Sequence, residues 1–319
     1  MFTIKAKDKK ARTGEIKTPH GNIRTPFFMP VATKGAIKYV SADEAEDLGY
    51  ECLISNALVN YFRPGLDIIG KAGGLHGFMG WDKAITTDSG GFQLLSESFM
   101  IKTTWEGALF KNPFDGQKEL ITPEKLMDIQ MALGSDIAMV LDDVCHYGTT
   151  HEAIRNSMAK THAWAKRCKD HHNGDQLLFG IVQGGIYKDL REESAKMITS
   201  LGFDGFALGG LAIGEPTSKM FDVIEHTLPM LPEDKPRYLM GVGSPVDMLK
   251  SIRDGVDMFD STFPTCNARH NTLFTFEGKL RIKNSCYKDD MHPIEEGCTC
   301  FTCRNHSRAF LHHLLRFKE

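Results

Sequence analysis

Residues 137–183, IAMVLDDVCHYGTTHEAIRNSMAKTHAWAKRCKDHHNGDQLLFGIVQ, contain one complete unit of the pattern that repeats along the chain. The stretch begins with an apolar run of strand type over 137–143 and ends with a second over 177–183. Between them, Thr149 and Glu152 have the spacing of a capping box, which predicts the start of a helix. Two strands separated by a helix indicate a parallel βαβ unit, because parallel strands need a long crossover connection.

Similar apolar runs recur along the chain, each followed by polar residues or glycine and then by a helical pattern. Eight such runs are the number that closes a (β/α)8 TIM barrel, and an open doubly wound sheet is the alternative. The expected strands are residues 26–31, 51–56, 84–88, 137–143, 177–183, 205–211, 237–242 and 258–260.

The segments on either side of these strands predict two smaller parts of an α/β protein. Residues 1–25 alternate around a turn signal and predict an N-terminal antiparallel cap, and the barrel is expected over residues 26–273. Residues 274–319 begin with an expected hairpin, in which 274–276 and 279–282 flank Glu277-Gly278. There is no internal repeat.

The composition is that of a globular protein. Of 319 residues, 41% are hydrophobic and 25% charged, with a net charge of −3, which excludes disordered and collagen-like classes. No apolar run reaches the roughly 18 residues that span a bilayer, and the N-terminus lacks a signal-peptide core. We therefore expect a cytoplasmic protein with no membrane partner. The weakly acidic balance argues against non-specific coating of nucleic acid but allows a local basic patch.

Polar residues stand where the expected strands end. Three strands end in aspartate (Asp88, Asp142 and Asp260), one in Gln183 and one in Asn56. Each residue alone has a structural explanation as a helix cap or a loop contact. Together they would line one mouth of a barrel and suit a planar ligand such as a guanine-like base, because carboxylates accept from ring N–H and amino groups. A further pair of carboxylates would suit chemistry at a sugar carbon.

A cysteine cluster near the C-terminal end predicts a metal site. Cys298, Cys300 and Cys303 offer three soft ligands at a spacing that suits one tetrahedral structural Zn²⁺, and reduced thiols without a metal are the alternative. This makes residues 274–319 a predicted zinc-binding subdomain. Three histidines follow as candidates for a fourth ligand: His306, His312 and His313. For the last two, a position on a helix surface explains them equally well.

Five motifs resemble those of the tRNA-guanine transglycosylases (queuine tRNA-ribosyltransferases), in the same order and across essentially the whole chain. They are residues 87–93 (TDSGGFQ), 180–185 (GIVQGG), 209–215 (GGLAIGE), 238–243 (YLMGVG) and 298–303 (CTCFTC). The resemblance implies a (β/α)8 barrel with a zinc subdomain. It also implies an enzyme of queuosine biosynthesis that replaces guanine at the wobble position of GUN-anticodon tRNAs with a 7-deazaguanine base.

The resemblance assigns roles residue by residue. Asp260 matches the nucleophile that attacks ribose C1′ and forms a covalent tRNA–enzyme intermediate, and Asp88 matches the general acid/base. The glycosidic bonds of the outgoing and the incoming base lie on the same face of the ribose. Two successive displacements through one aspartyl ester give this retention of configuration. Phe92 and Met240 match the residues that hold the base between them. The whole implied base-binding set is Asn56, Phe92, Asp142, Gln183, Gly209, Gly210, Leu211 and Met240.

Contact with tRNA is expected on the basic segment after the eighth strand, although a solvated surface is the ordinary explanation of such a segment. The candidates are Arg269, Lys279, Arg281 and Lys283. Contacts to phosphates would make binding sensitive to salt. Cys266 stands where the family usually has an arginine that helps hold the anticodon loop, which puts tRNA affinity or choice in question.

The incoming base and the activity each have an alternative. Residues 211–214 (LAIG) resemble bacterial enzymes, which use preQ1, whereas 141–144 (LDDV) resemble eukaryotic enzymes, which use queuine. We favour a bacterial-type enzyme and preQ1. A catalytically silent tRNA-binding subunit is the alternative function, and the presence of both Asp88 and Asp260 argues for activity. An unrelated zinc-dependent barrel hydrolase is excluded because the cysteine cluster lies outside the barrel strands.

The resemblance also implies a homodimer and places the fourth zinc ligand at a histidine downstream of residue 319. Either that residue completes the site or a nearer histidine substitutes for it.

Overall fold

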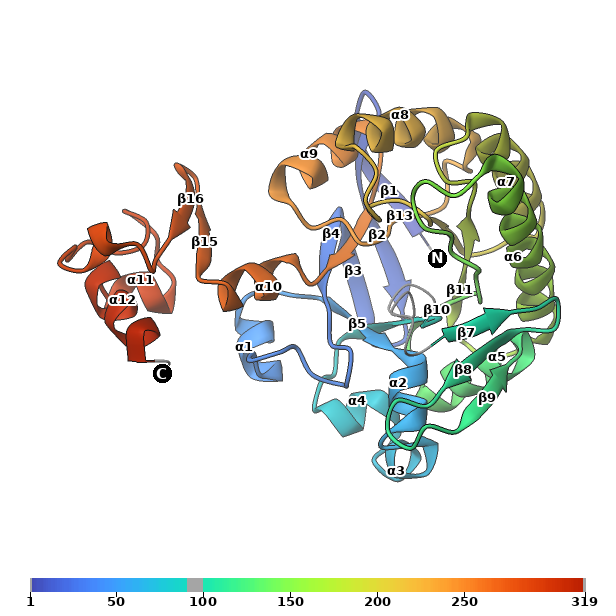
Figure 1. The fold of residues 1–319 in the computed structure, drawn as a ribbon, viewed down its shortest axis with the longest axis horizontal. Helices are drawn as coiled ribbons and strands as arrows, with labels where there is room; N and C mark the ends of the chain where they lie inside the picture. Colours follow the sequence, from blue (N-terminus) through green and yellow to red (C-terminus); the bar gives the residue numbers. More distant parts are fainter. Residues whose placement is uncertain (1, 91–99, 318–319) are drawn as a thin grey trace. The chain divides into compact units, whose positions relative to one another are not determined.

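The computed structural model describes residues 2–90 and 100–317. The chain divides into two compact units, Met1–Ser261 and Thr262–Glu319. The first contains all eight strands of the large sheet, and the second contains the orange to red elements from α10 onward in Figure 1. The boundaries expected after residues 25 and 273 remain predictions.

The eight expected strands form one parallel, nearly closed sheet. Its two end strands are linked by a parallel bridge between Val31 and Ile54, and the backbone N–H of Ala32 donates to the carbonyl of Ile54 at 2.7 Å. The predicted (β/α)8 barrel is confirmed, and the open sheet is excluded. In sheet order the strands are β4 (Phe27–Pro30), β14 (Met258–Ser261), β13 (Arg237–Leu239), β12 (Gly205–Leu208), β11 (Leu177–Val182), β10 (Ile137–Met139), β6 (Ala84–Asp88) and β5 (Cys52–Asn56).

Helices connect these strands, and the longest of them begins one residue later than predicted. Its N-cap is Thr150, whose hydroxyl accepts from the backbone N–H of Ala153 at 3.3 Å. The capping box expected from Thr149 and Glu152 is therefore wrong, because the second of two adjacent threonines caps the helix. The helices of this unit are α1 (Ala42–Asp47), α2 (Ala57–Phe62), α3 (Leu66–Lys71), α4 (Gly74–Met79), α5 (Pro123–Leu133), α6 (His151–His171), α7 (Lys188–Ser200), α8 (Thr217–Thr227), η2 (Leu228–Met230) and α9 (Pro245–Asp254).

Strand side chains supply the core of the barrel. Met29, Ile85, Phe179, Phe206 and Phe259 are each at most 1% exposed. Strands of a parallel sheet covered by helices read as continuous apolar runs, which is the pattern that identified them. Burial of each such side chain stabilises the fold by about 1.5–3 kcal/mol.

A three-stranded antiparallel sheet, predicted as the N-terminal cap, is fixed to the N-terminal end of the barrel. Arg12 forms a buried ion pair with Asp257, which immediately precedes β14. The Nδ1 of His20 lies 2.9 Å from the carboxylate of Asp136, which immediately precedes β10. The cap therefore leaves the C-terminal ends of the strands for a site. Its strands are β1 (Phe2–Asp8), β2 (Ala11–Thr18) and β3 (Gly21–Thr25).

A second antiparallel sheet, between β6 and α5, was not predicted (Figure 1). Its strands are short and mix charged with apolar residues, so that no continuous apolar run marks them. They are β7 (Met100–Thr103), β8 (Ala108–Lys111) and β9 (Lys118–Ile121).

The second unit contains the hairpin expected around Glu277-Gly278, with Thr275 paired to Gly278. Its elements are α10 (Phe263–Arg269), β15 (Thr272–Thr275), β16 (Gly278–Arg281), η3 (Ser285–Tyr287), α11 (Phe301–Asn305) and α12 (Arg308–Phe317). Among the helices of the described residues, none is long and apolar enough to cross a membrane.

Candidate active site

The C-terminal ends of consecutive barrel strands bring most of the predicted site residues to one mouth. Parallel strands all point their C-terminal ends to the same side, so neighbouring ends lie side by side. Asn56 and Asp88 are direct partners in the register of β5 and β6. The residues at this mouth are Asn56 on β5, Asp88 on β6, Asp142 after β10, Gln183 after β11, Gly209, Gly210 and Leu211 after β12, Met240 after β13 and Asp260 on β14.

The carboxylate of Asp88 has the properties of a group that exchanges protons near neutral pH. It accepts a hydrogen bond from the backbone N–H of Gly90 at 2.9 Å and another from the side chain of Asn56. Asn56 is oriented by its second role as the N-cap of α2, where its side-chain oxygen accepts from the N–H of Val59 at 2.7 Å. Burial raises the pKa of Asp88 to about 7, and the negative charges of Asp260 and Asp142 add to that rise.

The carboxylate of Asp260 accepts hydrogen bonds from other groups than Asp88 does. Its Oδ1 accepts from the hydroxyl of Tyr238 at 2.6 Å and from the N–H of Gly241 at 2.8 Å. Burial raises the pKa of Asp260, and these two hydrogen bonds oppose the rise because they stabilise the anion. Tyr238 is only 1% exposed. The sequence prediction assigned it no role, although its place on the strand next to β14 was a usable signal.

Asp142 and Gln183 form one hydrogen-bonded pair. The Nε2 of Gln183 donates to Oδ2 of Asp142 at 2.7 Å, and the hydroxyl of Ser89 donates to Oδ1 at 3.0 Å. Burial raises the pKa of Asp142 to about 6, so the group is still mostly ionised at neutral pH. The pair therefore presents a carboxylate and an amide with fixed orientations.

Bare glycine backbone packs against that amide. A Cβ at Gly209 would lie 2.6 Å from Nε2 of Gln183, and a Cβ at Gly210 would lie 2.6 Å from its Oε1. Gly210 also has a φ of +65°, which a residue with a side chain adopts only with strain. Leu211, which follows, is 3% exposed.

Asp143, next to Asp142, contacts a helix and a strand through its carboxylate. Its carboxylate forms an ion pair with Lys160 of α6 and accepts from the hydroxyl of Thr103 at 3.0 Å. It thus connects the barrel to the unpredicted β7–β9 sheet. Sequence reasoning missed Lys160 because the pair joins two elements and has no local pattern.

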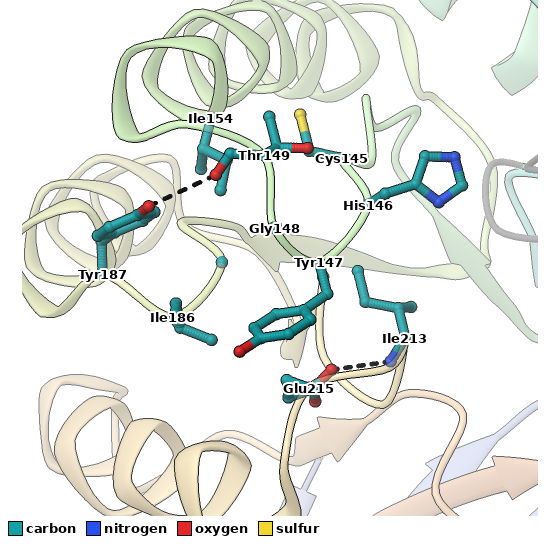
Figure 2. Close-up of a pocket in the computed structure, with 12 residues that line it drawn as sticks. Cys145, His146, Tyr147, Gly148, Thr149, Ile154, Ile186, Tyr187, Ile213 and Glu215 are labelled. Carbon is teal, nitrogen blue, oxygen red and sulfur yellow. Dashed lines mark hydrogen bonds between the residues drawn. The ribbon is translucent and has the colours of Figure 1, made fainter.

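A cavity of about 150 Å³ adjoins the glycine side of the site. Figure 2 shows Tyr147 and Tyr187 from the loops after β10 and β11, and Glu215 from the loop after β12. Gly210 is also among the lining residues, whereas Asp88 and Asp260 are not. The cavity therefore lies beside the expected base-binding wall, and the two catalytic candidates are not part of its lining.

Phe92, expected to contact the base, lies outside the described residues. Met240 is partly buried where β13 ends and packs against the core.

The basic segment is exposed in the second unit, with Lys279 and Arg281 on one side of β16 and Lys283 in the turn that follows it. Residues two apart on a strand point to the same side. Leu280 and Ile282 are buried at 7% and 2% exposure, and the cations that alternate with them are exposed. Arg269, the last residue of α10, is exposed as well. The alternating cations are Lys279, Arg281 and Lys283.

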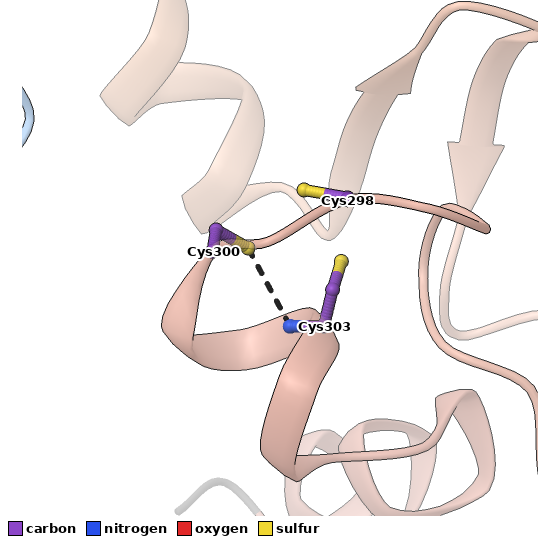
Figure 3. Close-up of side chains that lie close together, drawn as sticks. All are labelled: Cys298, Cys300 and Cys303. Carbon is purple, nitrogen blue, oxygen red and sulfur yellow. Dashed lines mark hydrogen bonds between the residues drawn. The ribbon is translucent and has the colours of Figure 1, made fainter.

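The three cysteines of the second unit are brought together (Figure 3). The Sγ atoms of Cys298, Cys300 and Cys303 lie within 4.8 Å of one another. Zinc–sulfur bonds of about 2.3 Å in a tetrahedron place sulfur atoms about 3.8 Å apart, so the group could hold a metal ion.

Nearby histidines face other partners. The Nδ1 of His312 lies 2.9 Å from the carbonyl of Ile282, and the ring of His306 stacks on Phe310 with centroids 4.9 Å apart. Among the described residues, no histidine or carboxylate belongs to the same close group as the three thiols.

Comparison with known proteins identifies the family. The family model described as queuine tRNA-ribosyltransferase matches residues 7–319. The chain belongs to this family.

Three relatives, each named queuine tRNA-ribosyltransferase, show the extent of the match. The protein of Oleidesulfovibrio alaskensis is 49% identical over 321 residues, covering 100% of this chain and 85% of the relative. That of Francisella tularensis subsp. novicida is 48% identical over 319 residues, covering 100% and 87%. That of Caldanaerobacter subterraneus subsp. tengcongensis is 50% identical over 312 residues, covering 97% and 83%. The resemblance inferred from the five motifs is confirmed, and the family is one of pentosyltransferases.

Proposed function

We propose that this chain replaces guanine at the wobble position of GUN-anticodon tRNAs with a 7-deazaguanine base, as a step of queuosine biosynthesis. The observation that carries the proposal is the pairing of two differently held carboxylates, Asp88 and Asp260, at the mouth that also carries the Asp142–Gln183 pair. One pair of groups suits chemistry at a sugar carbon, and the other suits recognition of a base.

In the first step, an ionised oxygen of Asp260 attacks ribose C1′. The C–O bond forms as the C1′–N9 bond breaks, and the bonding electrons leave with the guanine. Tyr238 and Gly241 both donate to Oδ1, so we assign the attack to Oδ2. Asp88 supplies the proton for the leaving base, a role that suits its pKa of about 7.

In the second step, Asp88 removes the N9 proton of the incoming base. The nitrogen then attacks C1′, and the ester bond to Asp260 breaks, which regenerates the carboxylate. The target nucleotide must leave the anticodon stack to reach the mouth.

Recognition of the base follows from the remaining groups. The Asp142 carboxylate accepts from the ring N1–H and the 2-amino group, and the second N–H of the Gln183 amide donates to the base carbonyl. We propose preQ1 rather than queuine as the incoming base, on the likeness of residues 211–214 to bacterial enzymes. Competition of the two bases for incorporation tests this, and a preference for queuine would contradict it.

We propose that Cys298, Cys300 and Cys303 hold one structural zinc ion, which would tie the loop before α11 to that helix without entering the reaction. We further propose a homodimer, a cytoplasmic location and tRNA contact through Lys279, Arg281 and the neighbouring cations. These rest on the family and on the exposed basic segment.

The test of the function is incorporation of radiolabelled guanine into a GUN-anticodon tRNA by the zinc-containing protein. We expect incorporation by the wild type, none by Asp260→Asn, and none into the same tRNA with adenine at the wobble position. A wild-type protein that binds this tRNA but incorporates no label would instead support the silent tRNA-binding subunit.

A further inference from the structure

Arg191 lies fully buried behind the base-recognition wall. It belongs to α7 and is 0% exposed. Its guanidinium donates to three backbone carbonyls: Nε to Gly185 at 2.8 Å, Nη1 to Val182 at 2.8 Å and Nη2 to Gly209 at 2.9 Å. One side chain thus binds the loops after β11 and β12, which carry Gln183 and Gly210.

Burying Arg191 in this way costs folding free energy, so stability by itself does not explain the arrangement. Buried arginines are usually paired with a carboxylate, since an isolated buried charge is unfavourable. Within the described part of the chain, Arg191 forms no ion pair. Three carbonyl dipoles stabilise its charge, together with the negative charge of Glu215 beyond ion-pair distance. Burial lowers its pKa to about 9, which leaves it a cation at neutral pH.

The bond to Gly209 determines the direction of the next N–H. In a planar trans peptide, the C=O and N–H groups point in opposite directions. Because the carbonyl of Gly209 points toward Arg191, the N–H of Gly210 points away from it. The described residues supply no acceptor for that N–H, and Gly210 is one of the residues that line the cavity beside Gln183. A flipped peptide would present a carbonyl there instead of a donor.

We infer that Arg191 is a positioning residue for base selection: it fixes the Gly209–Gly210 peptide so that the Gly210 N–H donates to the carbonyl oxygen of the bound base. The inference rests on the proposed function. Arg191 does not contact the base in this arrangement. It nevertheless determines how well the site distinguishes a purine with a 6-carbonyl from a purine without one.

Equilibrium binding of free guanine and of 2-aminopurine, which has hydrogen in place of that carbonyl and no N1–H, tests the inference. The contact of N1–H with Asp142 is common to the wild type and the variants, so it cancels when their preferences are compared. Arg191→Met removes the donors with little change of volume. We expect it to reduce the preference for guanine over 2-aminopurine about 3-fold to 10-fold, the range of one neutral hydrogen bond, while 2-aminopurine affinity changes less than about twofold. Arg191→Lys keeps the charge but cannot reach three carbonyls, and should lose part of the preference.

A matched control is Arg12→Met, which removes a buried arginine at the other end of the barrel. It should lower thermal stability and leave the preference unchanged. Equal weakening of both bases by Arg191→Met, or an unchanged preference, would overturn the inference, as would a wild type without preference. If Arg191→Met does not fold, an unchanged preference in Arg191→Lys has the same force. If the wild type prefers guanine in binding but does not incorporate it into tRNA, the proposed function is contradicted and the role of Arg191 is not.

Discussion

Replacing Asp88 with asparagine should strongly slow base exchange and change how the stability of the protein depends on pH. Burial raises the pKa of Asp88 from its ordinary 3.8 to about 7 in the folded protein. Between those values, the folded state holds a proton that the unfolded state has released. The free energy of unfolding of the wild type therefore falls by about 1.4 kcal/mol per pH unit as pH rises through this window.

Over about three units, the ionisation of Asp88 costs roughly 4 kcal/mol of stability by pH 7 and above. Asparagine has no such ionisation. We therefore compare the difference in unfolding free energy between Asp88→Asn and the wild type at two pH values. This difference should be about 3–5 kcal/mol larger at pH 7.5 than at pH 4, whatever its value at pH 4.

Urea unfolding of both proteins across this pH range measures the difference. The exposed carboxylate of Asp175 provides a control, since Asp175→Asn should give a curve parallel to the wild type. Parallel curves for Asp88→Asn and the wild type would show instead that folding leaves the protonation of Asp88 unperturbed. A guanine-exchange assay of the same preparation should show a loss of about 10²–10⁴-fold.

Other expected outcomes concern the nucleophile, the glycine wall, the thiols and the basic segment. Tyr238→Phe removes a hydrogen bond to the anion of Asp260, so the acid limb of kcat/KM should move up by about one to two pH units, and an unmoved limb would contradict this. Gly210→Ala places a methyl group 2.6 Å from the neighbouring amide at a φ of +65°, and should raise the KM for guanine at least tenfold and lower stability by about 1–3 kcal/mol. The Cys303→Ser variant should contain less zinc per chain than the wild type, as measured by elemental analysis. Lys279→Ala should reduce the slope of log tRNA affinity against log salt by about 0.7–0.9 if that side chain meets a phosphate.

The barrel was predictable because its signals are local and repeated. Each buried parallel strand is an apolar run, and the site residues lie at or shortly after the end of a run, as Asp88 at the end of β6 and Gln183 after β11 do. Barrel geometry then brings the strand ends to one mouth without further information. The beginning of α6 was missed by one residue because Thr149 and Thr150 are chemically equivalent caps.

The parts that escaped prediction depend on long-range contacts. Arg191 stands in the polar sequence KDLREES, which reads as an ordinary helix surface, and only the tertiary structure shows that it is buried. The Lys160–Asp143 ion pair likewise joins separate elements. The β7–β9 sheet has strands of only four residues with mixed polarity, so that its formation depends on pairing and not on a local pattern.

The proposed function depends most on Asp260 acting as the nucleophile in this mouth. The most direct measurement is to quench the protein with its GUN-anticodon tRNA, isolate the adduct that survives a denaturing gel, and map the modified residue by mass spectrometry after nuclease and protease digestion. We expect a ribose-linked peptide modified at Asp260 and no adduct with Asp260→Asn. An adduct on Asp88, or one that persists in Asp260→Asn, would contradict this assignment.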